Sequence, residues 1–133
     1  MQKEIQETLT NFFRNEEKIL VAYLFGSHAK KTNTSESDVD VAVLLSETPK
    51  KLLDYYLYLA NKLSEILGDN VDLVILNTAP PLLKHQVIKN GEIVYCRNEE
   101  ARITFEAKAQ CEYLDFSRAM ARYNECFMKQ IQA

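Results

Sequence analysis

Two aspartates separated by one residue, Asp38 and Asp40, stand at the start of an apolar run. Because side chains alternate along a strand, both carboxylates would point to the same side, with backbone origins about 6.6 Å apart. Without a cation, two carboxylates about 5 Å apart repel by roughly 3 kcal/mol at an effective dielectric near 20. The pair therefore favours a divalent metal ion. A solvated strand start after a Ser-rich loop is the alternative that spacing alone leaves open.

A glycine and a serine, Gly26 and Ser27, follow the apolar run 18–25 and precede Asp38 by ten residues. Glycine can adopt backbone conformations closed to other residues, and a helical turn that begins at Ser27 would direct free amide groups toward a phosphate. Alone, this pair also fits an ordinary turn or helix cap. At a fixed distance from the two aspartates, it predicts a phosphate held close to a metal ion.

The elements that position these residues follow from the hydrophobic pattern. We expect an opening helix over 2–13 and buried strands over 18–25 and 38–45. The most regular helical spacing begins near Pro49 and ends at Gly68. A strand, a short helix and a last strand follow, over 70–76, 80–90 and 92–96. The sequence thus predicts an α/β (α+β) fold, a small mixed sheet with flanking helices.

The C-terminal segment 98–133 contains no Gly or Pro and is rich in Ala, Glu, Lys, Arg and Gln, which predicts one long helix or a broken pair. Its large apolar residues do not form one clean face: Ile103, Phe105, Leu114, Phe116, Met120, Phe127 and Ile131. Two interpretations are equally open. Some of these residues dock on a second chain, or the helix packs on its own sheet and leaves scattered residues exposed. We divide the chain into a core, 1–97, and a helical extension, 98–133, packed on the same single domain.

Composition and charge exclude several classes of protein. The 133 residues, 47% hydrophobic, suit one globular domain. We expect a cytoplasmic protein, because neither a secretory signal nor a membrane span is apparent, and reduced thiols at Cys96, Cys111 and Cys126. A net charge of −3 argues against direct binding of nucleic acid, which requires clustered Lys and Arg.

Gly26-Ser27, ten intervening residues and Asp38-Val39-Asp40 together resemble the signature of the nucleotidyltransferase superfamily. The chain is most similar to the minimal nucleotidyltransferases, the MntA-type antitoxins encoded beside HEPN ribonuclease toxins. The resemblance extends over the opening and central helices, the strand 70–76 and the stretch 89–116. It implies a third carboxylate, at Asp72, although an aspartate at a strand edge after a turn fits the same position.

The resemblance implies that Asp38, Asp40 and Asp72 bind two magnesium ions and that Gly26 and Ser27 hold the phosphates of ATP. AMP would pass from ATP to a tyrosine of a partner HEPN ribonuclease toxin, which would be neutralised. Two alternatives stay open: a non-catalytic antitoxin that occludes the toxin, and a nucleotidyltransferase that modifies small molecules of the aminoglycoside type.

The chain departs from the family pattern directly after Gly26-Ser27. The family often continues Arg-Ala-Arg-Gly, whereas this chain has His28, Ala29, Lys30 and Lys31. Lysine supplies a point charge in place of the bidentate guanidinium group. The resemblance therefore implies a nucleotidyltransferase whose affinity for the nucleotide, or whose rate of transfer, could be lower than is usual in the family.

Overall fold

The computed structural model describes residues 2–26, 39–68 and 70–132. The elements in chain order are α1 (Gln2–Arg14), β1 (Ile19–Phe25), β2 (Val39–Leu45), α2 (Leu52–Leu67), β3 (Val71–Ile75), a 3-10 turn (Leu76–Thr78), α3 (Pro81–Asn90), β4 (Glu92–Cys96) and α4 (Glu99–Gln132). The four strands form one sheet in the order β3-β2-β1-β4. The predicted mixed sheet with flanking helices is confirmed.

The sheet is mixed because of how its strands are connected. β1 pairs antiparallel with both β2 and β4, whereas β2 pairs parallel with β3. Parallel neighbours need a crossover, which α2 supplies. The helix α2 ends where Gly68 adopts a left-handed conformation with φ 71° and donates its N–H to the Ser64 carbonyl. The chain can therefore turn back into β3 directly after the helix.

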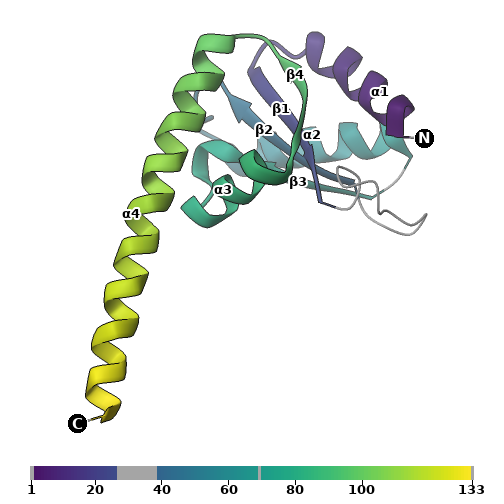
Figure 1. Ribbon diagram of the computed structural model, residues 1–133. Helices are drawn as coiled ribbons and strands as arrows, with labels where there is room; N and C mark the ends of the chain where they lie inside the picture. Colours follow the sequence, from purple (N-terminus) through teal and green to yellow (C-terminus); the bar gives the residue numbers. More distant parts are fainter. Residues whose placement is uncertain (1, 27–38, 69, 133) are drawn as a thin grey trace.

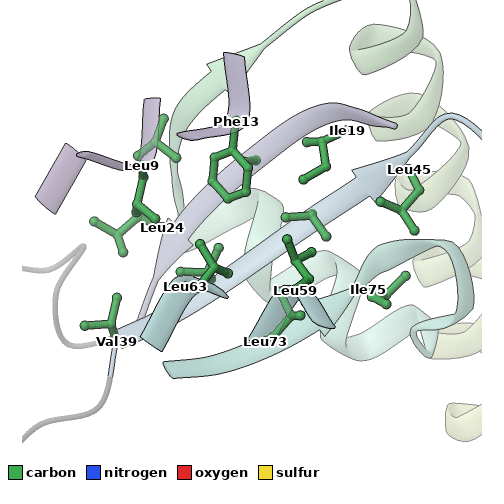
Figure 2. Close-up of a cluster of buried hydrophobic side chains, with 14 residues drawn as sticks. Leu9, Phe13, Ile19, Leu24, Val39, Leu45, Leu59, Leu63, Leu73 and Ile75 are labelled. Atoms are coloured by element: carbon green, nitrogen blue, oxygen red, sulfur yellow. The ribbon is translucent and has the colours of Figure 1, made fainter. Parts of the chain in front are cut away.

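One face of the sheet packs against α1 and α2. Figure 2 shows Leu9 and Phe13 of α1 and Leu63 of α2 in one cluster with the strand residue Val39. The strands carry near-continuous apolar runs because helices cover both faces of the sheet. The opposite face packs against α3 and α4 through Val87 and Phe105. The sheet is therefore the middle layer of three (Figure 1).

The helix α4 divides into a packed half and a projecting half. In the packed half Tyr23 donates its hydroxyl to Glu106 Oε1 at 2.8 Å, and Arg102 donates to Glu106 Oε2 at 3.0 Å. Burial raises the pKa of the Tyr23 phenol far above its ordinary value, so the phenol remains a neutral donor. Every residue from Leu114 to Ile131 is exposed, and this half extends away from the sheet (Figure 1). Among the described residues, no helix is long and apolar enough to cross a membrane.

The structure shifts the end of one predicted strand and decides between the two predictions for the C-terminal segment. The strand expected over 70–76 ends at Ile75, because Leu76 begins the 3-10 turn. In that turn Asn77 accepts the Leu45 N–H at 2.8 Å and donates to the Leu45 carbonyl at 3.0 Å, which satisfies the end of β2. The C-terminal segment forms one long helix, so the alternative of a broken pair is not adopted.

We predict that Leu63→Ala lowers the free energy of unfolding by about 3 kcal/mol, because a fully buried side chain leaves a cavity in the core. Urea unfolding followed by circular dichroism measures this change. Leu57 on the same helix is 49% exposed, so Leu57→Ala is the matched control and should change stability by less than about 0.5 kcal/mol. Equal losses in the two variants would contradict the assigned packing of α2.

Candidate functional site

Two of the three predicted carboxylates lie side by side at one end of the sheet. In the parallel pairing of β2 with β3, Asp40 is the register partner of Asp72. The next residues on the same side, Ala42 and Val74, pack with the cluster beneath α3 and α4. Asp40 and Asp72 therefore emerge on that same face of the sheet, because side chains alternate along a strand. Adjacent strands lie about 4.8 Å apart, so both carboxylates can reach one cation or a close pair of cations.

The two carboxylates differ in their exposure to solvent. Asp40 is partly buried on an inner strand, whereas Asp72 is exposed on β3, the edge strand of the sheet. Val39 donates its N–H to the Asn70 carbonyl at 3.0 Å, which fixes the start of β2 beside the start of β3. The site is therefore held in position from beneath by the sheet and remains accessible at its edge.

Gly26 packs directly against the Asp40 carboxyl group. Phe25, the last residue of β1, is the register partner of Asp40, and Gly26 follows it with φ +75°. A Cβ added at Gly26 would overlap Asp40 Oδ2 and lie 3.0 Å from Cγ. The position thus requires glycine for its backbone conformation and for the space that the carboxylate occupies. The sequence predicted the first requirement but carried no signal for the second.

The remaining predicted site residues, Ser27 and Asp38, lie in the stretch 27–38, outside the described residues, as do His28, Lys30 and Lys31. Their roles stay predictions. Within the described ranges, no three His, Cys, Asp or Glu side chains are grouped so that they could hold a metal ion. Asp40 and Asp72 thus form a two-carboxylate arrangement, which suits Mg²⁺, because this ion is usually bound by one or two carboxylates together with waters and phosphate oxygens.

A surface hollow lined by Lys18, Tyr55 and Tyr58 lies at the opposite end of the sheet, near the start of β1. Lys18 stands over the Tyr55 ring at 5.1 Å, and burial raises the pKa of the Tyr55 phenol to about 12. Since β1 pairs with Asp40 at its other end, these rings are remote from the two carboxylates. Their position gives these tyrosines no role at the acidic edge, the end of the sheet that carries Asp40 and Asp72.

Comparison with known proteins relates this chain to nucleotidyltransferases. A family model described as polymerase beta, nucleotidyltransferase matches residues 7–100. The protein adenylyltransferase MntA of Shewanella oneidensis is 39% identical over 75 residues. The matched segment covers 56% of this chain and 52% of MntA, so it spans about half the length of that relative.

Two solved structures match nearly the whole chain. A chain in the structure of a toxin-antitoxin with AMP-PNP has a TM-score of 0.72 and 26% identity, and the match covers 96% of this chain and 98% of that one. A chain in the structure of the tri-AMPylated Shewanella oneidensis HEPN toxin in complex with MNT antitoxin has a TM-score of 0.69 and 25% identity, with full coverage of both. The shared shape thus includes the segment that forms α4.

We predict that Gly26→Ala displaces the Asp40 carboxylate and weakens binding of Mn²⁺, used as a probe for Mg²⁺, by at least about tenfold. Electron paramagnetic resonance of the free ion measures this binding. Gly68→Ala is a matched control, because Gly68 has φ +71° and an added Cβ would meet nothing within 4 Å. Each variant should lose about 1–2 kcal/mol of stability through its left-handed backbone. Unchanged Mn²⁺ binding in Gly26→Ala would refute the role of this close approach.

Proposed function

The chain belongs to the polymerase beta nucleotidyltransferase family, and on that premise we propose that it is a protein adenylyltransferase antitoxin. It transfers AMP from ATP to a tyrosine of a partner HEPN ribonuclease toxin and thereby neutralises the toxin. Support comes from the similarity to MntA and to chains found with AMP-PNP and with an AMPylated HEPN toxin. The observation that carries the proposal is the register pairing of Asp40 with Asp72, next to Gly26.

Asp40 and Asp72 would hold two Mg²⁺ ions, with Asp38 as the further ligand that the family resemblance implies. Bound there, the ions supply positive charge to the phosphates and make a nearby hydroxyl more acidic. The close approach of Gly26 to the Asp40 carboxylate fits such a site, because it leaves no side chain between the backbone bend and the carboxylate. Gly26 and Ser27 would fix the departing phosphates through backbone amides and the serine hydroxyl.

The proposed reaction is an in-line displacement at the α-phosphorus of ATP. The tyrosine oxygen forms a bond to this phosphorus, the bond from the phosphorus to the bridging oxygen of the β-phosphate breaks, and pyrophosphate leaves. Asp72 accepts or orients the proton of the attacking hydroxyl, a role supported by its exposed position on the edge strand. A tyrosine on a protein surface can approach such an edge.

We predict that Asp40→Asn and Asp72→Asn each reduce AMP transfer to the cognate HEPN toxin by at least about 100-fold, because each removes an anionic oxygen ligand. Intact-mass measurement of the toxin after incubation with ATP and Mg²⁺ detects the added AMP units. Asp54, an exposed carboxylate on α2, provides the control, and Asp54→Asn should transfer AMP at the wild-type rate.

Two outcomes would redirect the proposal. Neutralisation of the toxin that survives Asp40→Asn would favour an antitoxin that acts by occlusion. Labelling of an aminoglycoside by the wild-type chain, without labelling of the toxin, would favour a transferase for small molecules.

A further inference from the structure

The projecting half of α4 carries a single apolar stripe that no part of the described chain covers. At about 100° per residue, its members fall within an arc of roughly 80° on the helix. We call them the free stripe: Phe116, Met120, Tyr123, Phe127 and Ile131. The charged residues of the same stretch fall on the opposite side of the helix: Asp115, Arg118, Arg122, Glu125 and Lys129.

The free stripe continues the face by which α4 packs on the rest of the chain. Phe105, Ala109 and Tyr113 lie in the same arc of the packed half. Phe105 packs in the second core cluster, Ala109 is 1% exposed, and Tyr113 stacks on His85 of α3 with ring centroids 3.6 Å apart. The free stripe therefore faces the open side next to α3, where the helix leaves the body (Figure 1).

The helix α3 connects the start of the free stripe to the acidic edge. Lys84 Nζ lies 3.0 Å from Glu112 Oε2, one turn before Phe116. At the other end of α3, a Cβ on Gly91 would lie 3.4 Å from Phe25 Cβ, and Phe25 is the register partner of Asp40. Lys84 and Gly91 are about 10 Å apart along a helix axis. A globular domain about 30 Å across that is seated on the stripe is therefore large enough to extend to the carboxylates.

We propose that the free stripe is the docking surface for the acceptor toxin, which it holds with the target tyrosine within reach of Asp40 and Asp72. The inference rests on the proposed function and adds to it the surface that selects the acceptor. The surface that fits the free stripe is an apolar groove on the toxin, which accepts one face of α4. The aromatic and Met side chains of the stripe act as the anchors in that groove. The network of Tyr23, Arg102 and Glu106 keeps the projecting half at a fixed angle to the site.

A second copy of this chain fits the free stripe less well. Two stripes cannot pair in parallel. In each copy the sheet and α3 already cover the same face of α4 over the turns before Phe116, where the second helix would have to lie. Antiparallel pairing would cover only five side chains that are 38–64% exposed. Such side chains would bury roughly 400–600 Å² per copy, which is less than the roughly 800 Å² per partner of a standard interface. A globular partner gains further area on α3 and the sheet edge.

The test compares two neighbouring residues of equal exposure. Phe127 is 50% exposed and belongs to the free stripe, whereas Met128 is 51% exposed and lies about 100° further round the helix. With the full chain and the cognate HEPN toxin, calorimetry should show binding at least about 30-fold weaker for Phe127→Asp, the loss expected for an anchor residue. Met128→Asp should bind within about threefold of wild type. Circular dichroism checks that both variants keep wild-type helicity.

Each outcome bears on the inference separately from the proposed function. Equal toxin affinity of the two variants would overturn the docking surface and leave AMP transfer untouched. A self-associating chain that Phe127→Asp converts to a monomer, without loss of toxin binding, would assign the stripe to a second copy and also overturn the inference. If toxin binding depends on Phe127 but wild type transfers no AMP, the docking surface stands and the adenylyltransferase proposal fails.

Discussion

The parallel pairing of β2 with β3 is the constraint on which the rest of the site depends. It makes Asp40 the direct neighbour of Asp72. A slip of one residue along either strand would turn one of these carboxylates toward the other face, where α1 and α2 pack. The pairing is held by the apolar residues that alternate with the acids: Val39, Val41 and Val43 on β2, and Leu73 and Ile75 on β3. The core beneath the site thus sets the distance between its charged groups.

This register also explains why an unfavourable pair of side chains is tolerated at the end of the sheet. Aspartate is unfavourable in strands, and two adjacent carboxylates repel each other. Both acids lie at the second residue of their strands, where Asp40 is partly buried and Asp72 remains exposed. The buried runs that follow them provide enough packing to support this arrangement, and a bound divalent ion would convert the repulsion into shared attraction.

Much of the fold could be predicted from the sequence, because strands covered on both faces read as short apolar runs and α2 reads as a regular helix. The proximity of Asp40 to Asp72 could not be derived from periodicity. It depends on which strands pair and in which direction, and only the family resemblance indicated Asp72. The overlap between a Gly26 side chain and Asp40 is likewise a tertiary fact, invisible along the chain. For Ser27 and Asp38 the prediction stands as made, since both lie outside the described residues.

The C-terminal helix shows a different limit of sequence reasoning. Ile103 and Leu114 obscured the pattern, because both lie off the arc shared in an unbroken helix by Phe105, Phe116, Met120, Phe127 and Ile131.

The exposure of every described residue from Leu114 to Ile131 has a kinetic consequence. Helical turns whose apolar face is not packed gain little stability in water, so the last turns of α4 should open and close by local unfolding. Amide hydrogens there exchange rapidly, and the unwound turns are substrates for proteases in the free chain. A bound partner would suppress this opening, so the lifetime of the polypeptide would rise with the amount of partner available to it.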